Sequence, residues 1–299
     1  MGRFMQVYAK VNLFLRVLDR RSDGYHNILS LMAHINLADL LKLEYAEVNT
    51  DPRDLCIEIK SSGGTFVDIL KTLDEKDNLI TRAMEEAAAV SGCGGTFRFL
   101  LEKNIPAGAG LGGGSGDAAG ALKLAGPMMG LDEAALHEIA SKIGADVPFH
   151  LNQGFSLCEG IGEVIEPLGE RLQCTLLVVN DGIHVDTGKA YRMLKRDKTH
   201  SLSDNEIQFL KENLRNIIKS GDLSRLQRIA VNDFENVVFK EYSNIALTKE
   251  KVIGAGAEFA MMTGSGSTVI GLFSSRKKAE EAAKTLKKSI KHIFLTDFA

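Results

Sequence analysis

Residues 103–119 read Lys-Asn-Ile-Pro-Ala-Gly-Ala-Gly-Leu-Gly-Gly-Gly-Ser-Gly-Asp-Ala-Ala, and six of them are glycine. An alternating apolar run precedes this stretch, and a run of small residues that is compatible with a helix follows it. Glycines let the backbone approach a ligand closely and adopt positive φ. A helix that begins near Ser115 would direct its free N–H groups and its positive dipole end at whatever the loop surrounds. The stretch therefore predicts an anion site, and phosphate is the most common anion of that size.

Two other interpretations of the glycine-rich stretch compete with a dedicated phosphate loop. A Gly-x-Gly-x-x-Gly pattern at Gly108, Gly110 and Gly113 is weak evidence for dinucleotide binding, because a second helix follows at residues 132–142 instead of a strand ending in an acidic residue. A plain strand-to-helix connector would not need three consecutive glycines, which cost conformational entropy. No Gly-Lys-[Ser/Thr] follows the spaced glycines, so the stretch is not a Walker A loop.

The bulk composition is that of an ordinary globular protein. The chain has 299 residues, 25% charged and 44% hydrophobic, which is enough for two domains with separate cores. A net charge of −3 gives no reason to expect nucleic acid or an anionic membrane as a partner. Apolar runs are short and the chain shows no targeting segment, so we expect a cytoplasmic protein. Four scattered cysteines form no Cys-x-x-Cys pair and no cluster with histidine, so neither a zinc site nor a disulfide framework is indicated, and direct metal ligands stay unknown.

Hydrophobic periodicity predicts strands and helices in both halves of the chain. In the first half we expect strands at 5–18, 33–44, 56–60 and 96–101, helices at 77–90, 115–125 and 132–143, and a hairpin of 154–159 with 163–166. In the second half we expect strands at 174–180, 259–262 and 268–273, helices near 187–194, 203–219, 223–231 and 276–290, and a short final strand. Asp77 or Asn78 is the expected cap of the first helix. Without a regular βαβ rhythm, this order indicates an α+β fold. The best boundary lies near residues 167–172, which gives domains at 1–167 and 168–299.

Two charged residues lie where burial is expected. Lys10 sits inside the first strand, and Asp146 sits in a Gly-Ala-Asp-Val-Pro turn between apolar neighbours. If the two meet, the lysine keeps the carboxylate ionised, and the carboxylate can accept a proton from a hydroxyl group. Lys10 could equally be an edge-strand lysine that prevents aggregation, and Asp146 could be an ordinary turn aspartate.

The order of the loop residues resembles the phosphate loop of the GHMP kinases, Pro-x-x-x-Gly-Leu-Gly-x-Gly-Ser-x-x-Ala-Ala. The matching positions are Pro106, Gly110, Leu111, Gly112, Gly114, Ser115, Ala118 and Ala119. Further blocks are similar to one branch of that family, which phosphorylates a diphosphocytidyl polyol in the non-mevalonate route to isoprenoid precursors. These blocks are Ala-Lys-Val-Asn-Leu-Phe-Leu at 9–15, Arg-x-Asp-Gly-Tyr-His at 21–26, Gly-Ala-Asp-Val-Pro at 144–148, Glu-Gly-x-Gly-Glu at 159–163, Thr-x-x-x-Tyr at 187–191, Asn-Asp-x-Glu at 232–235 and Thr-Gly-Ser-Gly at 263–266.

The resemblance implies a two-domain α+β fold, with an N-terminal domain like domain 2 of ribosomal protein S5 and a ferredoxin-like C-terminal domain. It implies an enzyme that uses ATP and Mg²⁺ to phosphorylate the 2-hydroxyl, a tertiary hydroxyl, of a small molecule, acting as a monomer or weak homodimer. Lys10 and Asp146 would be the catalytic pair. The acceptor side would comprise Asn12 beside the acceptor, Tyr25 and Tyr191 around the cytosine, His26 at its edge, and Thr187. The ATP side would comprise Asn78, Leu79, Lys103, Pro106, Ala107, Gly108, Ala109, Gly110, Leu111, Gly112, Gly113, Gly114, Ser115, Gly264, Ser265 and Gly266.

One segment departs from the branch pattern. Where a proline and a serine are usual before Thr187, this chain has Asp181 and Asp186. The resemblance therefore extends less fully to the residues expected around the cytosine than to the other site residues. Two alternatives stay open: a GHMP kinase for mevalonate-like or sugar alcohols, and a nucleotide-binding protein without catalysis. The presence of both Lys10 and Asp146 argues against the second alternative.

Overall fold

The computed structural model describes residues 3–66, 78–197 and 201–299. These residues form two compact units, and both contain helices and strands, so the α+β class is confirmed. The two long strands β1 (Arg3–Arg20) and β2 (His26–Asn49) each contribute residues to both units. The domain boundary expected at residues 167 and 168 stays a prediction. Unit 1 comprises Met1–Ala9, Leu37–Ala107 and Gly112–Asn152, and unit 2 comprises Lys10–Asn36, Gly108–Leu111 and Gln153–Ala299.

The sheet of unit 1 is built on the second half of β2. It pairs antiparallel with β4 (Gly94–Glu102), which pairs in parallel with β3 (Leu55–Gly63). In β4, Phe97, Phe99 and Leu101 alternate with partly exposed residues, because successive side chains of a strand point to opposite faces. The predicted strands at 56–60 and 96–101 are thus confirmed, with slightly longer bounds.

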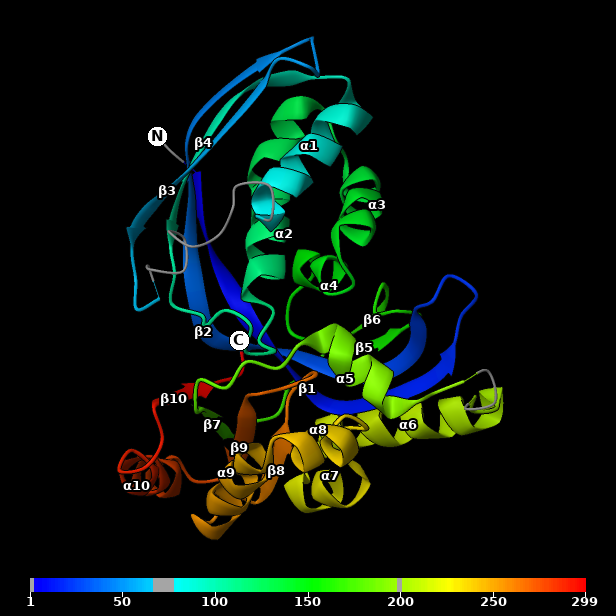
Figure 1. The fold of residues 1–299 in the computed structure, drawn as a ribbon, viewed down its shortest axis with the longest axis vertical. Helices are drawn as coiled ribbons and strands as arrows, with labels where there is room; N and C mark the ends of the chain where they lie inside the picture. Colours follow the sequence, from blue (N-terminus) through cyan, green and yellow to red (C-terminus); the bar gives the residue numbers. More distant parts are fainter. Residues whose placement is uncertain (1–2, 67–77, 198–200) are drawn as a thin grey trace. The chain divides into compact units, whose positions relative to one another are not determined.

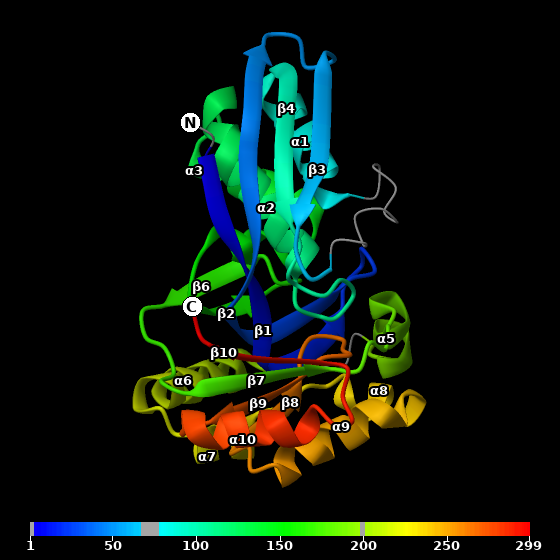
Figure 2. The same ribbon diagram turned by 90° about the vertical axis from the view of Figure 1, so that its left-hand side faces the viewer.

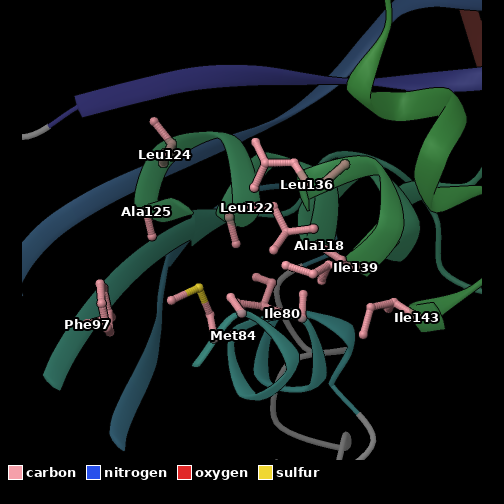
Figure 3. Packing of buried hydrophobic residues seen from close by; sticks show 14 of the residues in the cluster. Ile80, Met84, Phe97, Ala118, Leu122, Leu124, Ala125, Leu136, Ile139 and Ile143 are labelled. Carbon is pink, nitrogen blue, oxygen red and sulfur yellow. The ribbon is translucent and has the colours of Figure 1, made fainter. Parts of the chain in front are cut away.

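Helices cover one face of this sheet (Figures 1 and 2). They are α1 (Leu79–Ser91), α2 (Gly113–Ala125), α3 (Glu133–Ile143) and α4 (Val147–Leu151), with the short 3₁₀ helix η3 (Gly126–Met129) after α2. The buried residues of α1 recur at helical spacing and meet those of α2 and α3. Figure 3 shows Ile80 and Met84 of α1 pointing toward side chains of α2 and α3 such as Ala118 and Ile139.

Helix starts in unit 1 follow from local capping. The side chain of Asn78 accepts the Ile80 N–H at 2.9 Å, and that of Asp132 accepts the Ala135 N–H at 2.9 Å, as expected for N-caps. Asp77, the other predicted cap for α1, lies outside the described residues. Helix α2 begins at Gly113, two residues before the expected start, because Gly112 takes the N-cap position with a φ of +69°. The short helix α4 was not expected, because the Gly-Ala-Asp-Val-Pro turn predicts only a break.

Unit 2 contains a hairpin and a separate antiparallel sheet. Residues Ser30 to Ala33 of β2 pair with β5 (Phe155–Glu159), which pairs with β6 (Val164–Leu168). The second sheet has the order β10-β7-β9-β8. Its strands, β7 (Thr175–Asn180), β8 (Phe259–Met262), β9 (Val269–Phe273) and β10 (His292–Asp297), all occur where the sequence predicts them.

Helices α9 (Ser243–Gly254) and α10 (Arg276–Leu286) pack against this second sheet (Figure 2). Helices α5 (Thr187–Leu194), α6 (Asp204–Ser220) and α7 (Leu223–Ile229) also match expectation, whereas α8 (Glu235–Glu241) and α9 were not predicted. Within the described residues, no helix combines the length and apolar composition needed to cross a bilayer.

Candidate active site

The glycine loop leads directly into α2. Gly108, Gly110 and Gly112 have φ values of +64°, +78° and +69°, a region that other residues rarely adopt. The first bond within α2 runs from the Gly116 N–H to the Gly112 carbonyl oxygen at 2.8 Å, so the N–H groups of residues 113–115 precede it and are left for other partners. The loop therefore ends in N–H donors and a positive helix end, the local geometry that an anion site requires.

The predicted turn at residues 263–267 lies against the loop residues of unit 2. A Cβ atom at Gly110 would lie 2.8 Å from the carbonyl oxygens of Gly266 and Thr263. The Thr268 N–H donates to the Ala109 carbonyl oxygen at 3.4 Å. Gly110 is thus needed both for its positive φ and for this close approach. The structure brings Gly264, Ser265 and Gly266 together with this part of the loop.

Asn232 holds the turn in place. Its buried Nδ2 donates to the carbonyl oxygens of Met262 at 2.7 Å and Gly264 at 2.8 Å. Glu235 accepts the Met262 N–H at 2.8 Å. The Asn-Asp-x-Glu block is part of the family resemblance, but the sequence predicts no role for its residues. A compact polar block that precedes a glycine turn in the chain is the only pattern that could have indicated this contact.

Lys10 and Asn12 lie beside the same loop and turn. They are 4% and 1% exposed, so the interpretation of Lys10 as an edge-strand lysine is wrong. The Lys10 Nζ donates to Asn12 Oδ1 at 3.0 Å, and Asn12 Nδ2 donates to Ser30 Oγ at 2.8 Å. The Lys10 N–H donates to the Leu111 carbonyl oxygen at 2.9 Å. The Asn12 N–H donates to Thr263 Oγ1 at 2.8 Å. A buried ammonium and amide are therefore fixed next to the loop backbone.

Asp146 occupies the N-cap position of α4 in unit 1 and is half-buried. Pro148 stands in the first turn of this short helix, where a missing N–H costs nothing. Lys10 belongs to unit 2, and the ionic contact between Lys10 and Asp146 stays a prediction.

Aromatic side chains gather at the predicted cytosine side. The rings of His26 and Tyr191 are stacked, with centroids 5.2 Å apart and planes 23° apart. Phe234 meets Tyr191 edge-on at 4.8 Å. Burial lowers the pKa of His26, and the nearby Arg20 lowers it further, so its imidazole is neutral at pH 7 and can both donate and accept a hydrogen bond. Tyr25 is 60% exposed, and its contact with a base stays a prediction.

The two aspartates that depart from the branch pattern have structural partners. Asp186 is the N-cap of α5, the helix that carries Tyr191, and its side chain accepts the Lys189 N–H. Asp181 accepts a hydrogen bond from Thr248 Oγ1 at 2.9 Å. Thr187, at the first position of α5, shares a hydrogen bond of 2.8 Å with Ser265 of the glycine turn. An aspartate is as good an N-cap as serine, so the helix start is preserved.

The predicted ATP-side residues that precede the glycine loop lie in unit 1. Asn78 and Leu79 form the start of α1. Lys103, at 4% exposure, donates through Nζ to Asp39 at 2.5 Å and to Asp117 at 2.7 Å. Sequence reasoning did not find Asp39. Its only signal is an isolated aspartate within the apolar run 37–41.

One lysine cannot neutralise two buried carboxylates. Burial raises the pKa of Asp117 to about 7, with Lys103 opposing and Asp39 reinforcing the rise. Burial also acts to lower the pKa of Lys103, but its two carboxylate partners outweigh this and raise it, so the lysine stays protonated.

Among the described residues, no cluster of three or more His, Cys, Asp or Glu side chains is placed to hold a metal ion.

The comparisons with known proteins cover nearly the whole chain. The GHMP kinases N terminal domain matches residues 78–160, and the GHMP kinases C terminal domain matches residues 210–292. A 4-diphosphocytidyl-2-C-methyl-D-erythritol kinase of Thermodesulfovibrio yellowstonii is 35% identical over 281 residues, covering 93% of this chain and 92% of that protein. A protein of the same name from Solibacter usitatus is 36% identical over 286 residues, covering 94% of this chain and 84% of that protein.

Solved structures give the same result. A crystal structure of 4-(cytidine 5'-diphospho)-2C-methyl-D-erythritol kinase has a TM-score of 0.75 at 29% identity, and the match covers 100% of this chain and 99% of that chain. A homoserine kinase from Cytophaga hutchinsonii has a TM-score of 0.72 at 16% identity, and the match covers 99% of this chain and 95% of that chain. The two proteins share the fold. The chain therefore belongs to the GHMP kinases, in the family of the 4-diphosphocytidyl-2-C-methyl-D-erythritol kinases.

Proposed function

We propose that this chain transfers the γ-phosphoryl group of ATP to the 2-hydroxyl of 4-diphosphocytidyl-2-C-methyl-D-erythritol, in the non-mevalonate route to isoprenoid precursors. Full-length similarity to relatives of that name supports the proposal. The observation that carries it is the network in which buried Lys10 and Asn12 lie beside the glycine loop and the 263–267 turn. This network supplies the fixed polar groups that phosphoryl transfer needs, since that reaction depends mainly on positioning and electrostatics.

The glycine loop and the start of α2 would bind the phosphates of ATP. Their N–H groups and the positive helix end suit an anion, and Asn78, Leu79 and Lys103 would lie on the adenine side. Mg²⁺ would be bound mainly by the phosphates, because this ion usually keeps several waters and takes only one or two protein carboxylates. When bound, it would offset the negative charge of the phosphoryl oxygens.

Lys10, Asp146 and Asn12 would act on the acceptor. Lys10 would supply a positive charge beside the acceptor hydroxyl, and Asp146 would accept the proton of that hydroxyl. The acceptor oxygen then forms a bond to the γ-phosphorus as the bond to the β-phosphate oxygen breaks, which releases ADP. Asn12, fixed by Ser30 and Thr263, orients the hydroxyl.

Recognition of the cytidyl portion would fall to residues of unit 2. Tyr25 and Tyr191 offer aromatic faces to the flat base, and a neutral His26 would hydrogen-bond its edge. Thr187 lies at the start of the same helix as Tyr191. Action in the cytoplasm as a monomer or weak homodimer stays a prediction.

The test is ADP release from the purified protein with Mg-ATP and one of three acceptors: the diphosphocytidyl methylerythritol, mevalonate or homoserine. We expect turnover with the cytidyl acceptor alone. Turnover with another alcohol would keep the kinase reaction but overturn the substrate. No turnover with any of the three, alongside measurable ATP binding, would favour a non-catalytic nucleotide-binding protein.

The role of Asp146 is tested by Asp146→Asn. We expect kcat to fall by about 100-fold or more, since a positioned general base typically contributes at least that much, with ATP binding retained. Asp222→Asn is a matched control, because Asp222 is also a helix N-cap, in α7, and asparagine caps equally well. An unchanged kcat in Asp146→Asn would remove this carboxylate from the mechanism.

A further inference from the structure

A single buried carboxylate of unit 1 holds three successive residues at the end of β4. Asp39 is 0% exposed. Its Oδ1 accepts the N–H groups of Asn104 at 2.5 Å and Ile105 at 2.9 Å. Its Oδ2 accepts the Lys103 ammonium at 2.5 Å. Hydrogen bonds to a charged acceptor are about twice as strong as neutral ones, so this carboxylate fixes the chain firmly where it leaves the sheet.

The same lysine also reaches the far side of the glycine loop. Lys103 Nζ donates to Asp117 Oδ2 at 2.7 Å, and Asp117 lies near the start of α2. The glycine loop runs between these two anchored segments. Asp39 and Asp117 therefore tie the segment before the loop to the helix after it, with the Lys103 ammonium as the bridge.

The geometry of this bridge matters because the loop between its two ends is rich in glycine. Six of residues 103–119 are glycine, and glycine loses more conformational freedom on ordering than any other residue. Fixing both ends of such a loop before a ligand arrives reduces the entropy cost that binding would otherwise carry. Stability alone does not explain the cluster, because a buried ion pair is often no better than an apolar replacement.

We propose that Asp39 is a positioning residue for nucleotide binding. Its carboxylate, acting through Lys103 and Asp117, sets the spacing between the end of β4 and the start of α2, and so shapes the loop that binds the phosphates. The inference rests on the proposed function, in which this loop binds ATP. Asp39 acts through the loop backbone and does not touch the reacting atoms.

The experiment measures binding of the non-hydrolysable analogue adenylyl imidodiphosphate with Mg²⁺ by calorimetry, and steady-state kinetics against ATP and against the cytidyl acceptor. The variants are Asp39→Asn, which keeps an amide oxygen for the backbone N–H groups, and Asp117→Ala, which cuts the bridge without leaving an unpaired charge. Asp132→Asn is the matched control. It changes another unit 1 aspartate that accepts a backbone N–H, at the N-cap of α3.

We expect both variants to raise the Kd of the analogue about tenfold and to lower kcat/KM for ATP by up to about 100-fold, as small misplacements of binding groups do. KM for the acceptor should stay unchanged, and Asp132→Asn should match the wild type. All measurements are made well below each variant's Tm, so that a lower Tm alone does not alter the result. If Asp39→Asn does not fold, Asp117→Ala carries the same expectation.

Three outcomes would overturn the inference. Folded variants that bind the analogue as tightly as the wild type would show that the bridge only stabilises the fold, and the proposed function would stand. Equal losses against ATP and acceptor would point to general disorder instead of loop positioning. A wild-type protein that binds no nucleotide would overturn the proposed function together with this inference.

Discussion

Each unit contains a lysine that is buried to the same degree, and these two lysines have different surroundings. Lys10 of unit 2 and Lys103 of unit 1 are both 4% exposed. Lys103 lies between the carboxylates of Asp39 and Asp117. The Lys10 ammonium donates to the amide oxygen of Asn12, in a network that includes Thr263 of the glycine turn. The role of a buried lysine therefore has to be inferred from its interaction partners, because burial alone does not reveal it.

The two lysines differ in the roles that we propose for them, since Lys103 would position the loop and Lys10 would take part in catalysis. Two carboxylates hold the Lys103 ammonium firmly and raise its pKa, so it has little capacity to respond to a ligand. The Lys10 ammonium donates to the Asn12 side chain, the Lys10 N–H donates to the loop at the Leu111 carbonyl oxygen, and the Asn12 N–H donates to the Thr263 hydroxyl of the turn. Substitution of Lys103 should therefore act first on stability and loop shape, and substitution of Lys10 on turnover.

The largest effect is expected from Lys103→Met. It leaves two buried carboxylates close together without a cation, and removing one partner of a buried ion pair costs about 3–5 kcal/mol. Urea unfolding should show this loss at pH 7. Lys142→Met is the control, because Lys142 makes an exposed ion pair with Glu138 in α3, and such a pair contributes little to stability. A loss no greater than that of the control would contradict a structural role for the triad.

The next largest effect is expected from Lys10→Met. It should alter the activation free energy of the reaction more than the free energy of unfolding. If Lys10 acts with Asp146 on the acceptor hydroxyl, as proposed, removal of the lysine should lower kcat by about 100-fold, with little change in the Kd for the ATP analogue. The comparison with Lys103→Met then gives two opposite profiles, one in turnover and one in stability. An Lys10→Met protein that keeps its kcat but unfolds easily would erase the distinction between the two lysines.

Local features of both units could be predicted from sequence alone. The cap Asn78 lies where the sequence predicts one, since a polar residue there precedes an apolar helical pattern. The glycines at 108, 110 and 112 have the positive φ that their pattern predicts. These features depend on interactions within a few residues, so the residues themselves carry the information.

Features that depend on distant partners could not be predicted in the same way. Asp39 and Lys103 are 64 residues apart, and no periodicity links them. The role of Asn232 depends on the carbonyl oxygens of a turn that lies 30 residues further along the chain. Helix α9 was missed because it buries only Ile245, Thr248 and Val252, too few for a visible apolar stripe. The site residues on the acceptor side were assigned by resemblance, and their roles stay predictions.

The smallest effect, counted per unit of pH, is expected from the pH dependence of the triad in unit 1. The pKa of Asp117 is raised to about 7 from a usual value of 3.8, mainly by burial. Between these two values the folded protein holds a proton there that the unfolded chain has released. The stabilisation from this group is therefore complete below about pH 4 and is lost as the pH rises through 7.

Asp117→Asn removes this titration and leaves Lys103 paired with Asp39 alone. We expect the free energy of unfolding of the wild type to fall more steeply than that of the variant between about pH 5 and 7, by no more than about 1.4 kcal/mol per pH unit, the limit for one proton. Urea titrations across this range measure the difference in slope. Parallel pH profiles would mean that Asp117 is ionised throughout. The triad would then carry a net negative charge in the folded state, and the contrast with Lys10 would rest on geometry alone.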